Sequence, residues 1–400
     1  MRFRFKSLLT IIFLLIIGIV AIYIGYFFYK KVINPSYIDV DGGLTINYVS
    51  GKNFKFNNDN ELDFIVTNNS DEQLYYYIQF SDVQSTEVNY NLTSSNGIKF
   101  SNELKSDIIS DQLIISAHET VRHKIQFTDK DSGVYSGSIQ VGLKNNDKNT
   151  FANLILSHNQ ISDTILTPLG DSSVIDEGLI ADQDNLGVMY YFRGNVINNN
   201  VNFAGFDWKI VKINGDGSVK LVLNGIIEQI SKYYDSDIDF IDSTIYNVLN
   251  AWYNDNLKDY SDYIAYYNFC NDMTLETDNT TYIAYNRIIT NKIPNFICLG
   301  SFDNLKIGLL TADEVVYAGG GTLENKTYYL YNSNIETPYY TMTSAVYSSD
   351  NYYPFVISTD GSLVYNISGI LLRGVRPVIN IAKSTKATGD GTEENPYKIN

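Results

Sequence analysis

Residues 7–29 carry no charged side chain, and this apolar run constrains the chain more than any other feature of its sequence. A helix rises about 1.5 Å per residue, so the run is long enough to cross a hydrocarbon core of about 30 Å. A cleaved signal peptide has a shorter apolar stretch and a cleavage site of small residues, and neither is visible here. The sequence therefore predicts a retained signal-anchor, with a transmembrane helix over residues 7–29 of a segment 1–34.

Basic residues flank the run at both ends and predict its orientation. Arg2, Arg4 and Lys6 precede the run, whereas only Lys30 and Lys31 follow it. The positive-inside rule then places the N-terminus in the cytoplasm and the C-terminus outside. We therefore expect a single-pass protein of the cell membrane whose remaining residues are extracellular.

The rest of the chain is strongly acidic. The net charge of the whole chain is −16, and residues 1–34 hold basic but no acidic side chains, so the acidic excess lies entirely beyond them. Such a surface repels nucleic acid and anionic lipid head groups, and we expect no nucleic-acid partner. The hydrophobic fraction of 44% supports packed domains rather than a disordered tail.

Residues 35–150 have the pattern of short β-strands. Apolar and polar residues alternate over Leu44–Tyr48, Leu62–Val66, Val121–Phe127 and Tyr135–Val141, with Asn, Asp, Gly and Ser between these segments. Alternating strands at regular spacing predict an all-β, Ig-like antiparallel sandwich. We expect this domain to act as a spacer, followed by a linker over residues 151–180.

Residues 181–400 have a mixed pattern and predict an α+β domain. Two apolar strands within residues 208–223 flank the turn Asn214–Ser218, which is typical of a β-hairpin because Asn and Gly tolerate positive φ angles. An apolar stripe at helical spacing predicts a helix over Asp242–Asn256. A capping-box pattern predicts a shorter helix over Thr311–Ala318, ended by three glycines.

Cys270 and Cys298 are the two cysteines of the chain, and both lie in this last region. In an extracellular domain they predict a disulfide. In the chain-entropy model a closed loop of about 28 residues is stabilised by roughly 3–4 kcal/mol. No histidine follows His158, so neither Ser-His-Asp catalysis nor a His-ligated metal site is available within residues 181–400.

Several short motifs follow one another in residues 187–400. They are Tyr190–Gly194, Asn198–Asn199, Phe203–Gly205, Trp208, Ile213–Ser218, Trp252–Tyr253, Leu257, Cys270, Cys298, Gly308–Glu314, Ala318–Gly319 and Gly374–Pro377. In their order and spacing these motifs resemble an uncharacterised domain of exported surface proteins from low-GC gut bacteria. The resemblance covers roughly half of the chain and implies a role at the bacterial cell surface. The family carries no established activity that could be transferred.

A more distant resemblance is to the superfold of the formylglycine-generating enzyme and the C-type lectins. Leu310–Glu314 matches the segment that opens a helix in that superfold, and Gly374–Arg376 matches a segment near its end. The resemblance implies a C-type-lectin-like fold for residues 181–400. The enzyme also needs a closely spaced pair of late cysteines, and none follows Cys298, so the oxidase activity is not implied.

Asp235, Asp237 and Asp239 alternate along one short segment. Alternate residues of an extended segment share a face, and several carboxylates on one face suit Ca²⁺. These three residues are therefore the candidates for a calcium site, with a merely solvated acidic run as the alternative. We expect no other metal or cofactor.

Tyrosines concentrate within residues 328–353, among Ser, Asn and Thr. Flat amphipathic rings beside hydrogen-bonding side chains suit recognition of a carbohydrate or a protein. We select Tyr339, Tyr340, Tyr352 and Tyr353 as candidate ligand contacts, although tyrosines in such a pattern also occupy cores and strand edges.

Glycoside hydrolysis needs only two carboxyl groups at a set separation. Acidic candidates are Glu276, Asp313, Glu314 and Glu324, but a helix N-terminus already explains the middle two. We therefore assign no catalytic residue. Arg193 and Arg376 are rare cations in an acidic domain, and we expect each to pair with a buried carboxylate.

Taken together, these patterns predict a membrane-anchored bacterial surface protein that presents a non-catalytic, adhesion-type recognition domain. Its expected partner is a surface glycan or protein. Two alternatives stay open. One is a carboxylate-dependent envelope hydrolase, and the other is a structural component of the envelope.

Overall fold

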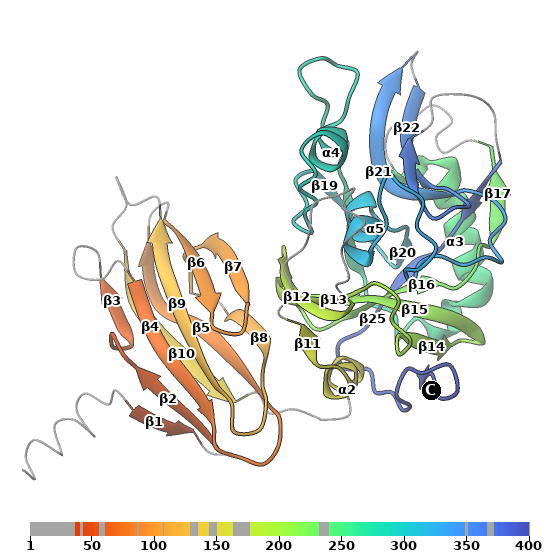
Figure 1. Cartoon of the computed structure of the whole chain (residues 1–400). Helices are drawn as coiled ribbons and strands as arrows, with labels where there is room; N and C mark the ends of the chain where they lie inside the picture. The colour runs from red at the N-terminus through yellow and green to blue at the C-terminus, as the bar shows by residue number, and fades with distance from the viewer. Residues whose placement is uncertain are drawn as a thin grey trace, which may run out of the picture. The chain divides into compact units, whose positions relative to one another are not determined.

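The computed structural model describes residues 37–40, 43–55, 61–85, 88–106, 108–128, 135–143, 150–162, 177–231, 240–348, 351–365 and 372–399. Contacts within the chain divide it into two compact units. The first unit ends at Leu143 and the second covers the residues after it, except that residues 97–100 and 109–113 group with the second. Figure 1 labels the strands and helices of both units.

The first unit is built from two β-sheets. Within the described residues, one sheet has the strand order β1-β2-β4-β9-β6-β7 and the other has the order β3-β10-β5-β8. The strands are β1 (Tyr37–Val40), β2 (Leu44–Tyr48), β3 (Asn53–Lys55), β4 (Glu61–Asn68), β5 (Leu74–Ser85), β6 (Asn89–Ser94), β7 (Lys99–Glu103), β8 (Ile108–Ile115), β9 (Thr120–Thr128) and β10 (Tyr135–Leu143). Strand β9 alternates between exposed and buried residues along its length, as its sequence pattern predicts.

Aromatic side chains from both sheets meet between them and form the core of the first unit. The ring centroids of Phe54 on β3 and Phe127 on β9 are 4.9 Å apart. Phe80 on β5 and Tyr90 on β6 approach edge to face, also at 4.9 Å. Because each pair joins one sheet to the other, the two sheets pack face to face.

His123 on β9 lies completely buried in this core. Its Nε2 atom is 2.6 Å from the hydroxyl of Tyr76, and its ring stacks on Phe64 at 5.0 Å. Burial lowers the pKa of His123 to about 3, so the ring is neutral at ordinary pH. His123 is therefore part of the core packing.

Three sheets make up most of the second unit. Among the residues described, the largest sheet follows the order β11-β12-β13-β15-β16-β25-β20, and β14 pairs with both β15 and β26. Its strands are β11 (Ile161–Ser162), β12 (Gly178–Asp184), β13 (Gly187–Arg193), β14 (Asn200–Phe203), β15 (Phe206–Ile213), β16 (Val219–Leu223), β20 (Ile307–Gly308), β25 (Val378–Ile381) and β26 (Tyr397–Lys398). Every residue of β13, β16 and β25 is buried, because both faces of the sheet are covered there.

The two smaller sheets complete the β-structure of this unit. One has the order β17-β24-β21-β22-β23, and the other pairs β18 with β19. Their strands are β17 (Glu228–Ile230), β18 (Tyr267–Asn271), β19 (Ser301–Leu305), β21 (Tyr339–Ser348), β22 (Asn351–Ile357), β23 (Leu363–Tyr365) and β24 (Arg373–Val375).

The helices of the second unit are short. They are α2 (Phe151–His158), η2 (Phe240–Asp242), α3 (Thr244–Asn256), η3 (Lys258–Tyr260), α4 (Ile283–Tyr285), the π-helix η4 (Asn286–Thr290) and α5 (Ala312–Ala318). The predicted capping box is confirmed, since Thr311 and Glu314 form it at the start of α5, and Ser243 caps α3. Helix α5 contacts β13 of the largest sheet and β21 of the five-stranded sheet, so it lies between the two (Figure 1).

The predicted hairpin is also confirmed. Strands β15 and β16 pair antiparallel, and Asn214 and Ser218 close the turn through a backbone hydrogen bond of 2.8 Å. Gly217 has a φ angle of +88°, a conformation that favours glycine. The Ser218 amide and hydroxyl both donate to the side chain of Asp216, which fixes the turn further.

The predicted fold class needs correction. We expected an N-terminal membrane helix, a sandwich and an α+β lectin-like domain, but the structure is mostly β, and the second unit consists chiefly of sheets with short helices beside them. The apolar segments of this unit are too short to form long helices. Their backbone N–H and C=O groups form hydrogen bonds with neighbouring strands in sheets instead. The predicted domain boundaries at residues 34, 150 and 180 stay predictions.

The predicted localisation is corrected as well. No helix within the described ranges is long and apolar enough to cross a membrane, so the single-pass topology is without support. The predicted span, residues 7–29, lies outside the described residues, as do residues 163–176 of the predicted linker.

Candidate functional site

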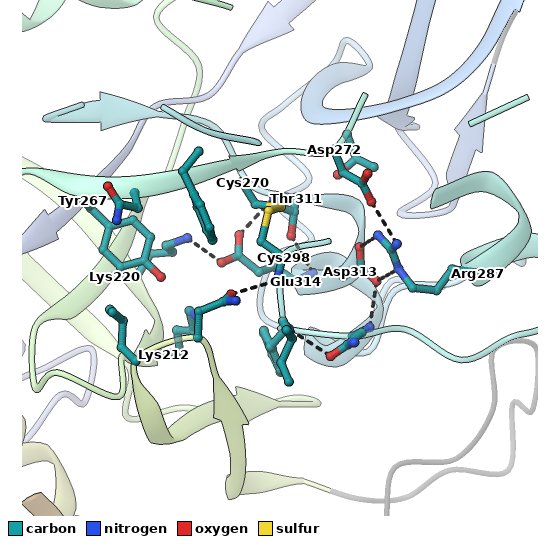
Figure 2. A pocket seen from close by; sticks show the side chains of 18 residues that line it. Lys212, Lys220, Tyr267, Cys270, Asp272, Arg287, Cys298, Thr311, Asp313 and Glu314 are labelled. Atoms are coloured by element: carbon teal, nitrogen blue, oxygen red, sulfur yellow. Dashed lines mark hydrogen bonds and ion pairs between the residues drawn. A yellow bond between two sulfur atoms is a disulfide. The ribbon is translucent and has the colours of Figure 1, made fainter. Parts of the chain in front are cut away.

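A cavity of about 240 Å³ lies within the second unit. Figure 2 shows the side chains that line it. They come from the turn between β12 and β13, from β15 and β16, from β18 and the segment that follows it, from η4 and the loop after it, from β19, from the start of α5, and from β21. Many of the side chains labelled in Figure 2 are charged and point toward one another rather than toward solvent.

The first turn of α5 supplies the carboxylate at the centre of the site. The capping box orients Glu314, because its Oε2 atom accepts the Thr311 backbone N–H at 3.0 Å. Its Oε1 atom accepts a hydrogen bond from Lys220 Nζ on β16 at 2.6 Å. Both side chains are only 3% exposed, so this is a fully buried ion pair.

A second buried ion pair lies beside the first. Lys212 on β15 donates to Asp184 Oδ2 at 3.1 Å, and both side chains are 3% exposed. Asp184, at the end of β12, also accepts the backbone N–H groups of Leu186 and Gly215. The Asp184 carboxylate therefore fixes two loops as well as the lysine.

Arg287 forms the third charged group of the cavity. Its Nε and Nη2 atoms donate to the two oxygens of Asp313 at 3.0 and 2.8 Å, and Nη1 donates to Asp272 Oδ2 at 2.9 Å. The Asn295 backbone N–H donates to Asp313 as well. Arg287 projects from the π-helix η4, a rare geometry that is frequent at functional sites.

Burial and pairing shift the pKa values of these groups in different directions. Burial lowers the pKa of Lys220, and repulsion from the Lys212 ammonium lowers it further. Attraction to Glu314 raises the pKa but does not fully reverse this shift. Burial opposes the charge of Glu314, but the two lysines outweigh it and lower its pKa. Burial likewise opposes the charges of Lys212 and Arg287, yet the acidic groups around each raise their pKa values. Glu314 is therefore ionised at neutral pH.

One wall of the cavity is held by the disulfide between Cys270 and Cys298, which confirms the predicted bond. The two Cα atoms are 5.6 Å apart. Phe296, on the same loop as Cys298, stacks on Tyr317 with ring centroids 3.8 Å apart. The segment between the two cysteines also carries Arg287, so the bond closes a loop that supplies much of the lining.

Apolar side chains mark the opening of the cavity. Leu186 and Phe302 both line it, and each is 44% exposed. The site therefore combines buried ion pairs inside the cavity with apolar side chains at its opening.

The four selected tyrosines do not line this cavity. Tyr339 and Tyr340 on β21 are buried, each only 4% exposed, and the Tyr339 hydroxyl accepts a hydrogen bond from Arg376 at 2.8 Å. This burial is incompatible with the contact role predicted for these two. Tyr352 and Tyr353 on β22 are partly exposed, and their role in ligand contact stays a prediction.

The predicted calcium ligands Asp235, Asp237 and Asp239 lie outside the described residues. Within the ranges that the structure describes, no group of three or more His, Cys, Asp or Glu side chains could hold a metal ion.

The four acidic candidates are not brought together as a set. Asp313 and Glu314 both line the cavity, where each already pairs with a cation. Glu276 accepts a hydrogen bond from Asn286, and Glu324 pairs with Lys326 on an exposed surface.

Arg193 and Arg376 bind carbonyl groups. Arg193 donates to the backbone carbonyls of Val316 and Tyr317, which ties β13 to the end of α5. Arg376 donates to the carbonyls of Leu223 and Leu330. The expected pairing of Arg376 with a carboxylate is not among its hydrogen bonds. Its Nε and Nη1 atoms donate to backbone carbonyls and the Tyr339 hydroxyl, and its buried Nη2 atom has no hydrogen-bond partner among the described residues.

Sequence reasoning missed the cations of the cavity, although two of them carry a signal. Lys220 interrupts the otherwise apolar and fully buried strand β16, and Lys212 lies in the buried second half of β15, among Ile210, Val211 and Ile213. A lysine in such a strand must find a carboxylate or a cavity. Arg287 and Asp272 lie in an irregular segment without periodicity, so no local pattern identifies them.

The fold and the site define a mostly β protein. Its second unit contains a cavity that is lined by buried ion pairs and has a disulfide in one wall. Comparison with protein-family models, curated proteins and solved structures finds no match for this chain.

Proposed function

We propose that the second unit is a non-catalytic recognition domain that binds the end of a glycan in the cavity. The observation that carries this proposal is the lining itself, in which the charged groups are paired with one another beneath an apolar rim. Ligand pockets typically combine apolar walls with a few polar groups that orient the ligand. The disulfide also fits a domain that works in an oxidising compartment.

The charges favour a neutral ligand. Asp272, Asp313 and Glu314 line the cavity, and Asp184 pairs with Lys212 beside it, so four carboxylates oppose the three cations Lys212, Lys220 and Arg287. An anionic ligand would add to the acidic excess, and this opposes its binding. A neutral sugar avoids that cost, and its hydroxyl groups both donate and accept hydrogen bonds.

The lysines offer the hydrogen bonds that such a ligand needs. Each ammonium group carries three N–H bonds, and the structure gives each one carboxylate partner. The remaining N–H bonds can donate to sugar hydroxyl oxygens. Phe302 at the opening can stack against the apolar face of a sugar ring. A cavity of about 240 Å³ limits the bound portion to a small, ring-sized unit.

The carboxylates argue for binding over hydrolysis. A glycoside hydrolase needs one carboxyl group that stays protonated at working pH. Glu314 has a lowered pKa and accepts a hydrogen bond from Lys220, so it carries no proton of its own at neutral pH. Asp313 accepts hydrogen bonds from Nε and Nη2 of Arg287 on its two oxygens.

A glycan array probed with the full chain tests the proposal. Removing the aromatic ring with Phe302→Ala should weaken binding about fivefold, as expected for a contact worth about 1 kcal/mol. Leu323→Ala is the matched control, because Leu323 is exposed but does not line the cavity.

Three outcomes would count against the proposal. The full chain could bind no glycan, which would favour a structural role. The two variants could lose binding equally, which would move the contact surface away from the cavity. Release of free reducing ends would favour the hydrolase alternative.

A further inference from the structure

Lys220 is an unusual amine because it is buried and yet lines a cavity. Its side chain is 3% exposed, and its Nζ atom lies among the groups that enclose the cavity (Figure 2). Strand β16 is buried along its whole length, so the backbone that positions Lys220 is rigidly packed. A small molecule that enters the cavity therefore meets an amine in a fixed position.

Burial and a neighbouring cation favour the neutral form of Lys220 more than they do for an exposed lysine. Two aromatic rings shield the amine from water, because its Nζ atom lies 4.7 Å from the ring centre of Tyr267 and 5.3 Å from that of Phe269. The faces of these rings attract the ammonium form, so they oppose the shift. The Lys212 ammonium faces the same cavity and repels a second positive charge. The charges that oppose these effects are those of Glu314 and, further away, Asp184. Burial, the largest of these effects, leaves the pKa of Lys220 below its ordinary value.

Glu314 completes the arrangement as a proton acceptor. Its Oε1 atom is 2.6 Å from Lys220 Nζ, within reach for direct proton transfer. The Thr311 backbone N–H holds the other oxygen, so the carboxylate cannot turn away. An amine with an acid–base partner in a shielded cavity is the arrangement that carbonyl addition requires.

We propose that Lys220 captures small aldehydes or ketones in the cavity as a covalent imine, with Glu314 moving the protons. The ammonium first gives a proton to Glu314, and the nitrogen lone pair then attacks the carbonyl carbon to form a C–N bond. The carbonyl oxygen becomes a hydroxyl group and takes a proton from Glu314. Glu314 then takes a second proton from the nitrogen and gives it to this hydroxyl group, which leaves as water as the C–O bond breaks and the protonated imine forms.

The charges and atoms of this reaction balance. One ammonium and one carbonyl compound give one protonated imine and one water, with no oxidant or reductant. The product carries the same single positive charge as the starting ammonium. The Glu314 carboxylate therefore has a cationic partner before and after the reaction, and both groups are neutral after the first proton transfer, so no buried charge is left uncompensated.

Two other lysines show why the site is Lys220. Lys212 lines the same cavity, but its pKa is raised, and its partner Asp184 is committed to two backbone N–H groups. Burial also lowers the pKa of Lys209, but Lys209 donates to an amide oxygen of Asn200 and does not line the cavity. Only Lys220 among these three combines the cavity, the lowered pKa and a carboxylate proton acceptor.

Reductive trapping on the full chain tests this proposal. The protein is treated at neutral pH with glycolaldehyde in less than equimolar amount and then with sodium borohydride, and peptides are mapped by mass spectrometry. We expect a mass increase of one glycolaldehyde less one water plus two hydrogens, at Lys220 in at least about tenfold preference over Lys212 and Lys209. Labelling spread over exposed lysines, with Lys220 unmodified, would overturn the proposal.

Variants separate the roles of the two residues. Lys220→Arg keeps the positive charge beside Glu314 but cannot form the imine, and it should abolish specific labelling while the protein stays folded. Glu314→Gln should slow the initial labelling of Lys220 by about a hundredfold. An unchanged rate in Glu314→Gln would remove the proton-transfer role.

The capture reaction shares the cavity with the proposed glycan site but is tested independently of it. Glycan binding without labelling of Lys220 overturns the capture reaction alone. Labelling of Lys220 without glycan binding overturns the recognition function alone.

Discussion

A single side chain, that of Arg287, neutralises two carboxylates from different segments of the cavity wall. Asp313 belongs to α5, and Asp272 follows β18. The planar guanidinium meets Asp313 with two parallel hydrogen bonds and Asp272 with a third. A lysine has no such fork, so the geometry is specific to arginine.

Replacing Arg287 by glutamine should therefore destabilise the second unit by about 3–5 kcal/mol, because two buried carboxylates lose their cation. Urea-induced unfolding of the full chain measures this change. Lys326→Gln is the control, since Lys326 and Glu324 form an exposed pair whose loss should leave stability almost unchanged. Equal effects of the two substitutions would mean that the Arg287 network contributes no more than a surface pair.

Among the elements of the second unit, the disulfide-closed segment from Cys270 to Cys298 matters most for the cavity. It includes the end of β18, helix α4, the π-helix η4 and the loop that carries Phe296. Little regular structure holds this segment, because α4 spans only three residues and η4 five. The covalent bond therefore limits how far this wall can move.

Replacing both cysteines by alanine should lower the free energy of unfolding of the second unit by roughly 3–4 kcal/mol, the value expected for a loop of this length. The same variant should bind glycans more weakly than the parent, because the wall that carries Arg287 and Phe296 loosens. Calorimetry and the glycan array measure the two effects. A double variant that retains full affinity would show that the cavity is held without the bond.

At the scale of the whole molecule, the parts that follow local rules are those that the sequence predicts well. The hairpin at Asn214–Ser218 and the caps at Ser243 and Thr311 are each decided by a few neighbouring residues, and the structure has them. The disulfide also follows from its two cysteines alone. The overall class was wrong, because local patterns do not reveal how many strands join one sheet.

The cavity depends on ion pairs between residues that are far apart in the sequence, so local sequence patterns could not predict it. Lys220 and Glu314 are 94 residues apart in the chain, and Arg287 and Asp313 are 26 apart. Only the folded sheets bring them together. Tyr339 and Tyr340 failed as surface contacts for the same reason, because the pattern of a strand does not tell which sheet covers it.

The pH dependence of stability provides a last test, to which His123 contributes over a defined range. An unfolded histidine takes up a proton near pH 6.5, whereas folded His123 stays neutral down to about pH 3. Below pH 6.5 the unfolded state therefore binds more protons, and stability falls as the pH falls. Glu61 and Asp63 have lowered pKa values, so their contributions are present above the ordinary carboxyl pKa of about 4 and are lost only below it.

Between pH 6.5 and pH 4.5 the first unit should consequently lose about 2–3 kcal/mol through His123. The double variant Tyr76→Phe with His123→Phe removes the titrating ring together with its hydroxyl partner, so its stability should vary less over this range by the same amount. His118→Gln is the control, because His118 is exposed and pairs with Asp71 at the surface. Urea titrations of the three proteins at several pH values measure the difference, and parallel curves for the parent and the double variant would refute the assignment to His123.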